Sequence, residues 1–250
     1  MERKYWVPAI ERADQVLRLV ARYPGELRLI DLSKRTDINK SSMFSLLNTL
    51  EKLDWVRRDK DDTFRIGAAL GALAGGYFQQ NDLIASFHLE AALTKSKLEE
   101  TIQLAELLGN EVLYLAKEEF PGPVKLMSEP GMRLPAHSTA LGKVLLSGLP
   151  DDRWPRLYSD ADAEPLERLT PNTITELSAL HAEVGLIRER GYAEDTEEAV
   201  QGFCCIAVPI VRHGKTVSAI SCSMLRHRWE SKREFVLSEL LQLADRLSIA

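Results

Sequence analysis

The sequence is poor in the residues that build disulfide frameworks and metal sites. It has three cysteines, of which Cys204 and Cys205 are adjacent, and five histidines that stand far apart. Three cysteines make no disulfide framework, so a reducing compartment is expected. The histidines show none of the paired spacings that metal sites use, and we predict no metal and no cofactor.

Long hydrophobic runs are also missing. Residues 1–6 hold no apolar core of signal-peptide length, and the longest apolar stretch, residues 66–78, is shorter than the ~18 to 20 residues of a membrane span. The sequence therefore predicts no membrane association and a cytoplasmic location. With 45% hydrophobic and 28% charged residues in a chain of 250, two globular domains of ordinary composition are expected.

Charge is divided unevenly between the two ends of the chain. Residues 1–66 carry 14 Lys and Arg against 11 Asp and Glu, a net charge of +3, whereas the remainder carries −8. A mildly basic segment joined to an acidic one is typical of a nucleic-acid reader attached to a domain that does not touch DNA.

Residues 27–66 contain the parts of a winged helix-turn-helix in the required order. Apolar periodicity predicts a helix near residues 29–33, a polar turn over 36–39, and a second helix over 40–53. An earlier helix is expected over 10–22. In the second helix the predicted inward residues are Met43, Leu46, Leu47, Leu50 and Leu53, and the predicted outward stripe is Ser41, Phe44, Ser45 and Asn48. Short, uncharged side chains of this kind suit the floor of a major groove.

A predicted hairpin follows, with strands over 55–58 and 63–66 and a polar turn over 59–62. An ordinary amphipathic helix beside a hairpin is the alternative, but the order of elements favours a DNA-binding wing. The predicted contacts to double-stranded operator DNA are Lys40, Ser41, Ser42, Phe44, Ser45, Asn48, Arg57, Arg58 and Arg65.

The rest of the chain mixes helices and strands without strict alternation. Helix is expected from 68 to 108 with a break near 79–82, so that 83–108 forms one long connecting helix. Strands are expected over 111–116, 124–127, 204–211 and 216–224, and helices over 140–147, 173–190 and 230–250. This predicts an α+β fold with a largely antiparallel sheet, divided into residues 1–67, 68–82 and 83–250.

The sequence contains no complete catalytic motif. Gly214-Lys215-Thr216 has the end of a phosphate loop, but Pro209 occupies the position of the earlier glycine. The acidic run over 194–198 is more typical of a solvated face than of paired catalytic carboxylates. No catalytic residue is predicted.

Three separated motifs resemble the IclR family of bacterial transcriptional regulators. They are Arg133-Leu134-Pro135-Ala136-His137-Ser138-Thr139-Ala140-Leu141-Gly142-Lys143, the run from Gly191 to Glu198, and the run from Gly202 to Pro209. The segment from Asn39 to Gly67 is similar to the DNA-binding part of the family. Two positions depart from the family pattern: Ser45 stands where an Arg is usual, and Asp54 where a Gly is usual.

The resemblance implies a GAF-like C-terminal effector domain and a homo-oligomer, either a dimer or a dimer of dimers. It also implies an effector pocket formed by Ala140, Leu141, Asp195, Cys205, Ser221 and Ser223. Strand periodicity independently places Ser221 and Ser223 on one face and Cys222 on the other, and opposes Cys205 to Cys204.

Such a pocket suits a small carboxylate or keto acid, since hydroxyls, a thiol and amides at a helix start are hydrogen-bond donors. An ionised Asp195 would repel this anion. It would then accept from an effector hydroxyl, be screened by donors, or be protonated.

We therefore predict a ligand-responsive regulator that binds operator DNA and senses a small organic acid. Two alternatives stay open at this point. One is a redox sensor based on Cys204, Cys205 or Cys222, although the sequence shows no basic residue that would lower a thiol pKa. The other is an enzyme that uses Cys205 and Asp195, although no histidine is tied by motif to either residue.

Overall fold

A computed structural model describes residues 7–122, 128–153, 155–158 and 166–249. Contacts between residues divide the chain into two units, residues 1–80 and 81–250. Each unit is described by itself. The helix over 68–79 groups with the first unit, and the division into 1–67, 68–82 and 83–250 stays a prediction.

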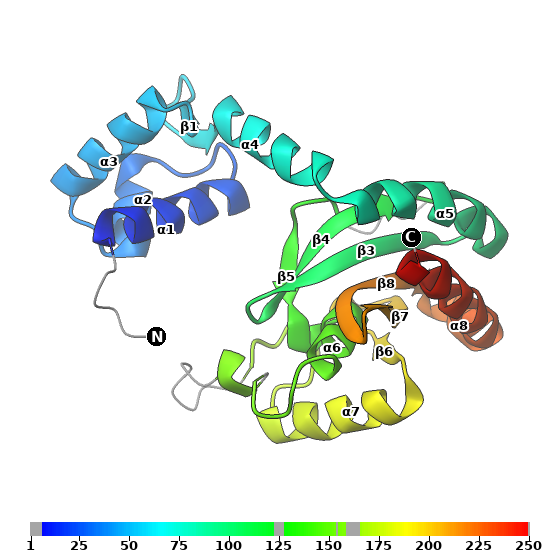
Figure 1. Cartoon of the computed structure of the whole chain (residues 1–250). Helices are drawn as coiled ribbons and strands as arrows, with labels where there is room; N and C mark the ends of the chain where they lie inside the picture. Colours follow the sequence, from blue (N-terminus) through cyan, green and yellow to red (C-terminus); the bar gives the residue numbers. More distant parts are fainter. Residues whose placement is uncertain (1–6, 123–127, 154, 159–165, 250) are drawn as a thin grey trace. The chain divides into compact units, whose positions relative to one another are not determined.

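The first unit is a winged helix-turn-helix (Figure 1). Its elements are α1 (Pro8–Arg22), α2 (Leu29–Thr36), α3 (Lys40–Lys52), β1 (Val56–Arg58), β2 (Phe64–Ile66) and α4 (Ala68–Gln79). Asp37 follows the end of α2 and adopts the left-handed conformation, and Asn39 caps the start of α3, where its side chain accepts a hydrogen bond from the Ser42 amide at 2.9 Å. Met43, Leu47 and Leu50 pack into the core with α1. Leu53 was expected to face inward, but it caps the helix and is 49% exposed.

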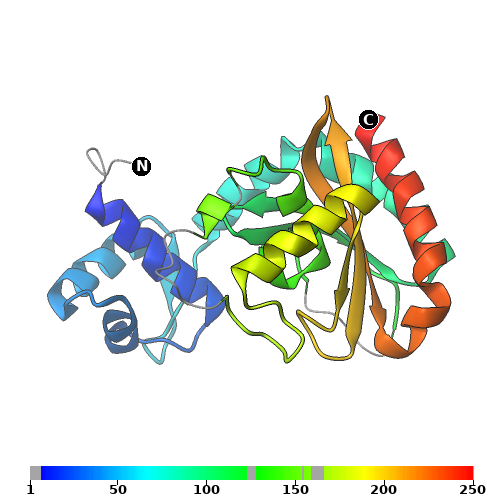
Figure 2. The same ribbon diagram turned by 90° about the horizontal axis from the view of Figure 1, so that it is seen from below.

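The second unit is built on one antiparallel sheet of strand order β5-β4-β3-β8-β7-β6. The strands are β3 (Thr101–Leu108), β4 (Glu111–Glu118), β5 (Arg133–Pro135), β6 (Ala193–Thr196), β7 (Phe203–Arg212) and β8 (Lys215–Leu225). One face is covered by α5 (Asp82–Leu98) and α8 (Arg226–Ile249), and the other by α6 (Ala140–Ser147), on which α7 (Leu177–Arg190) packs (Figures 1 and 2). Two short 3₁₀ turns flank α6 in the sequence: Ala136–Ser138 precedes it and Pro155–Leu157 follows it.

This arrangement confirms the α+β fold with an antiparallel sheet and corrects several boundaries. The long helix expected over 83–108 is wrong: α5 ends at Leu98, Glu99 takes a positive φ of 54°, and residues 101–108 form the strand β3. The apolar spacing in that segment fits either structure, and pairing on both edges with β4 and β8 decides for the strand. α7 begins at Leu177 rather than 173, and α8 begins at Arg226 rather than 230.

Two strands, β5 and β6, were not predicted from the sequence because they are short. β5 has three residues and β6 has four, and each pairs along one edge of the sheet. The strand expected over 124–127 lies outside the described residues. In the described part of the chain, no helix is long and apolar enough to cross a membrane.

Candidate functional site

The outward face of α3 carries the predicted base-reading side chains. Ser41, Ser45 and Lys40 are exposed, and Phe44 is exposed to 54%. Asn48 and Ser42 are half-buried at the margins of this face. The Ser45 hydroxyl donates to the Ser41 carbonyl at 3.2 Å, so its proton is used within the helix and its lone pairs remain to accept a hydrogen bond. This face is therefore uncharged apart from Lys40, and it combines hydroxyl and amide groups with the exposed ring of Phe44.

The predicted wing arginines lie on paired strands. Arg57 stands opposite Arg65 in the β1–β2 ladder, and both are exposed. Asp59 contacts Arg57 at 3.7 Å and also pairs with Arg65, while Arg58 contacts Asp62 at 2.8 Å. Exposed ion pairs of this kind contribute at most ~1 kcal/mol. They therefore offer little resistance to an exchange of the carboxylate for a phosphate.

All six residues predicted for the effector pocket line one cavity of the second unit. The cavity lies between the sheet and the start of α6, and its volume is about 30 Å³, which is room for about two water molecules. Ala140 and Leu141 come from α6, and the strands β6, β7 and β8 supply the lining residues Asp195, Cys205, Ser221 and Ser223. As the strand period predicts, Cys204 and Cys222 are absent from the lining.

The start of α6 presents free backbone amides to this cavity. Thr139 caps the helix: its side chain accepts from the Gly142 amide at 2.9 Å, and its carbonyl accepts from the Lys143 amide at 3.0 Å. The amides of Ala140 and Leu141 have no hydrogen-bond partner among the described residues. Gly142 is required here, because a Cβ at that position would overlap the carbonyl oxygen of Ala136. Unpaired amides of the first turn are the groups with which helix N-termini can bind an anion.

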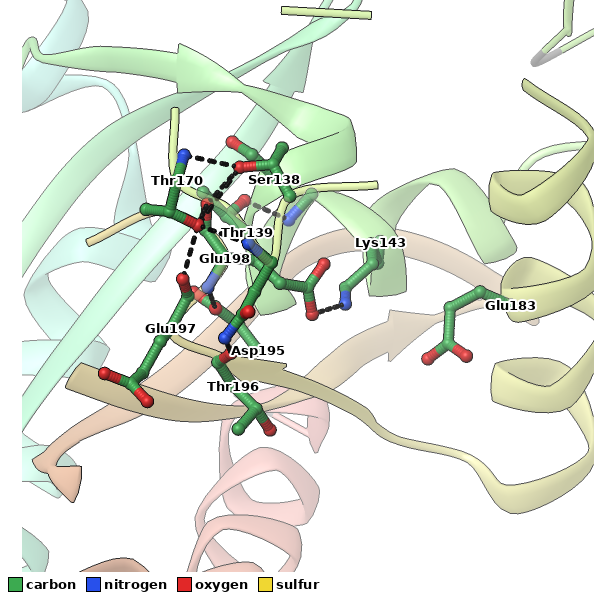
Figure 3. Close-up of polar contacts among 12 residues, drawn as sticks. Ser138, Thr139, Lys143, Thr170, Glu183, Asp195, Thr196, Glu197 and Glu198 are labelled. Atoms are coloured by element: carbon green, nitrogen blue, oxygen red, sulfur yellow. Dashed lines mark hydrogen bonds and ion pairs between the residues drawn. The ribbon is translucent and has the colours of Figure 1, made fainter. Parts of the chain in front are cut away.

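A buried ion pair stands beside the cavity (Figure 3). Lys143 is 1% exposed, and its Nζ donates to Glu198 Oε1 at 2.5 Å. The Glu198 carbonyl accepts from the hydroxyls of Thr170 at 3.1 Å and Thr173 at 2.7 Å. These bonds fix the segment after β6, in which Ala199, Val200 and Phe203 form one wall of the cavity.

Asp195 belongs to the same network. Its Oδ1 accepts from the Glu198 amide at 2.6 Å, so the carboxylate holds the turn that forms the cavity wall. Burial, and secondly the charge of Glu198, raises the pKa of Asp195 to about 7. Burial also raises the pKa of Glu198, although Lys143 opposes this shift. The Lys143 ammonium group is thus hydrogen-bonded to Glu198 rather than to Asp195, and Asp195 takes up a proton readily near neutral pH.

The cysteines are poor candidates for redox chemistry. Burial raises the pKa of Cys204 to about 11 and raises the pKa of Cys205 and of Cys222 above the ordinary thiol value. Thiols with raised pKa values are poor nucleophiles at neutral pH. Among the described residues, no group of His, Cys, Asp and Glu could hold a metal ion.

Comparison with known families agrees with both parts of this description. Residues 9–60 match the IclR helix-turn-helix domain, and residues 75–249 match the C-terminal region of the bacterial transcriptional regulator IclR. The second match alone covers more than half of the chain. This chain belongs to the IclR family. It is a bacterial transcriptional regulator with a helix-turn-helix DNA-binding domain and a C-terminal effector domain.

Relatives and solved structures cover nearly the whole IclR-family chain. The HTH-type transcriptional regulator XynR of Escherichia coli K12 is 31% identical over 242 residues, 95% of this chain and 94% of XynR. An IclR transcriptional regulator from Alicyclobacillus acidocaldarius has a TM-score of 0.82 at 26% identity, covering 98% of this chain and 99% of that one. An IclR homologue from Microbacterium hydrocarbonoxydans, complexed with 4-hydroxybenzoate, has the same fold, with a TM-score of 0.75 at 22% identity over 97% and 100% of the two chains.

The structure places further residues at the cavity that the sequence did not assign to a site. Tyr114, Val200 and Phe203 line the cavity, and Lys143 and Glu198 brace its wall. Lys143 lies inside the first IclR-like motif and Glu198 inside the second, so the sequence did mark both residues as part of the family pattern. A lysine on a helix is ordinarily expected in solvent, however, and only the fold shows that this one is buried.

Proposed function

We propose that this IclR-family regulator binds a small organic acid in the cavity between α6 and the sheet, and that occupancy of the cavity changes its affinity for operator DNA. The homologues are transcriptional regulators, and we assign no catalytic role to any residue of this chain. The Microbacterium homologue was crystallised with 4-hydroxybenzoate, an organic acid, which supports the class of effector.

The free amides of Ala140 and Leu141 carry this proposal. They are main-chain donors without partners in the described part of the chain, their residues line the cavity, and they stand at the positive end of a helix dipole. A carboxylate is one of the small anions that such a pair of donors fits, and the 4-hydroxybenzoate of the Microbacterium homologue carries one. Ser221, Ser223 and Cys205 supply further polar atoms on the opposite wall. The volume of about 30 Å³ holds about two water molecules, so even an acid of few atoms requires the cavity to widen when it binds, and an aromatic acid requires a larger movement of the wall.

Asp195 does not oppose anion binding in this arrangement. One of its oxygens already accepts from the Glu198 amide, which lowers the free energy of the charge, and its raised pKa allows protonation at little cost when an anion approaches. Two of the roles considered for Asp195, a charge screened by hydrogen-bond donors and a protonated carboxyl group, therefore both have physical support.

For the DNA-binding part we propose that Ser41, Phe44, Ser45 and Asn48 of α3 read bases and that Lys40, Ser42 and the wing arginines contact the backbone. We further propose a homo-oligomer. α4 is an apolar helix of which no residue is buried, and Leu73 is 64% exposed. Pairing of two copies along α4 would remove this surface from water and present two reading helices to a symmetric operator.

The test is calorimetric titration of small organic acids into the full chain, with and without an operator fragment that the protein itself has selected from a random DNA library. We expect binding with operator-dependent affinity, since a coupling of ~1–3 kcal/mol changes affinity about five- to 150-fold and is reciprocal between the two sites. The double variant Ser221→Ala, Ser223→Ala should lose the acid.

Ser218→Ala is the matched control. Ser218 lies on the same strand and is equally buried, but its hydroxyl donates to the Ala105 carbonyl and it does not line the cavity. If the double variant binds the acid as tightly as the control does, the cavity is not the effector site. If acid affinity is identical with and without operator, the cavity binds but does not regulate.

A further inference from the structure

Gln103 stands directly behind the two cavity serines. It lies on β3, where it pairs with Ser221 of β8, and it is 1% exposed. It is not part of the cavity lining. A glutamine amide buried at this depth must satisfy its hydrogen bonds within the protein, because leaving a buried polar group unpaired costs ~1–3 kcal/mol.

The amide of Gln103 distributes its hydrogen bonds unequally between the serines. Its Oε1 accepts from the Ser221 hydroxyl at 3.0 Å, and its Nε2 donates to Ser223 Oγ at 3.1 Å and to Ser128 Oγ at 3.3 Å. Both hydrogens of the amide nitrogen are then used. The Ser221 hydroxyl therefore uses its proton in a hydrogen bond to Gln103. The Ser223 oxygen instead accepts a hydrogen bond from Gln103, and the Ser223 hydroxyl proton can still be donated elsewhere.

The two serines therefore differ in what they offer a ligand. Ser221 presents lone pairs only and acts as an acceptor. The remaining proton of Ser223 is close to weak or distant acceptors, Cys205 Sγ at 3.2 Å and Gln103 Oε1 at 3.3 Å, so it is available to a better acceptor in the cavity. A pair of one acceptor and one donor is complementary to a group that both donates and accepts.

We propose that Gln103 is a positioning residue that sets this hydrogen-bond polarity and makes the cavity select 2-hydroxy acids over the matching 2-oxo acids. The inference rests on the proposed function. With the carboxylate on the amides of Ala140 and Leu141, a 2-hydroxyl group can donate to Ser221 and accept from Ser223. A 2-oxo group can only accept, and it faces the lone pairs of Ser221.

The experiment uses matched pairs of acids on the full chain: lactate with pyruvate, and 2-hydroxybutyrate with 2-oxobutyrate. The readout is the ratio of dissociation constants within a pair, which a general loosening of the cavity does not change. Wild type should favour each hydroxy acid about tenfold, the factor for one hydrogen bond of ~1.4 kcal/mol. Gln103→Met, which frees the proton of Ser221, should bring the ratio close to one.

Gln103→Glu is the rescue. It keeps an acceptor for Ser221, so the hydroxy acid should stay the preferred member of each pair, while its added charge and the loss of the amide donor to Ser223 weaken both acids. Gln103→Asn, which withdraws the carbonyl by one methylene, is the second disruptive variant if the methionine variant does not fold. A wild-type preference for the oxo acids, or an unchanged ratio in the disruptive variants, overturns the role of Gln103 alone. If wild type binds none of the four acids at millimolar concentration, the small-acid function falls together with this inference.

Discussion

Removal of the buried ammonium group of Lys143 should destabilise the effector domain in a pH-dependent way. Lys143→Met keeps the length and apolar stem of the side chain but leaves the Glu198 carboxylate without its partner, and Glu198 Oε2 is already buried without a hydrogen bond among the described residues. Breaking a buried pair from one side costs ~3–5 kcal/mol in general.

Protonation of Glu198 sets an upper limit on that cost. Giving a proton to a carboxyl group of ordinary pKa at pH 7 requires about 3.7 kcal/mol, at 1.36 kcal/mol per pH unit. Burial already raises the pKa of Glu198 in the intact pair, so part of this cost is present in wild type. We expect a loss of about 2–3 kcal/mol in the free energy of unfolding at pH 7. Because the folded variant prefers the protonated acid, the loss should shrink as the pH falls toward the ordinary carboxyl pKa.

The assay is urea unfolding with pulsed hydrogen exchange, read on peptides of α6 and β7 so that the second unit is followed separately. Lys117→Met is the matched control: Lys117 also contacts a glutamate, Glu129, at 2.5 Å, but that glutamate is 64% exposed and its charge stays solvated. The double variant Lys143→Met, Glu198→Gln should recover most of the stability. A loss that is the same at pH 5 and pH 7, or that the double variant does not relieve, would refute the reasoning.

Three further predictions concern single residues. The pKa of Asp195 is about 7 in the folded protein against 3.8 in the unfolded chain. Protonation of Asp195 should therefore contribute stability that is complete below about pH 4 and is lost as the pH rises through about 7, a change of up to ~4 kcal/mol in the free energy of unfolding. Urea unfolding of the Asp195→Asn variant should lack this decline. Asn48→Ala should cost ~1–3 kcal/mol on the selected operator and far less on random DNA, and equal losses in a fluorescence-anisotropy titration would remove Asn48 from base reading. Arg57→Ala should reduce the slope of log affinity against log salt by about one unit, because Arg57 is exposed and contacts Asp59 only at 3.7 Å; an unchanged slope would place it outside the interface.

Local patterns predicted much of this molecule from sequence. The period of α3 gave its buried and outward faces, α6 has the predicted bounds, and the alternation along β8 correctly separated Ser221 and Ser223 from Cys222. These features depend on residues a few positions apart, where helix and strand geometry are decisive.

Features that depend on distant residues were missed. The apolar spacing of β3 suits a helix and a strand equally, and its state is decided by pairing with β8, more than a hundred residues later. Gln103 meets Ser221 across a separation of 118 residues, and Lys143 meets Glu198 across 55. No local pattern predicts such contacts, since a buried glutamine or lysine has the same sequence signature as an exposed one.

The cap at the start of α6 has a consequence for how effector specificity changes in evolution. The donors proposed to hold the carboxylate are main-chain amides, which every substitution except one to proline preserves, and Gly142 allows the helix to approach Ala136 closely enough to keep them in place. The rest of the ligand would be read by side chains on separate strands. Single substitutions on β7 or β8 could then exchange one organic acid for another while the affinity for the shared carboxylate is inherited unchanged, so that new sensors arise without passing through a form that binds nothing.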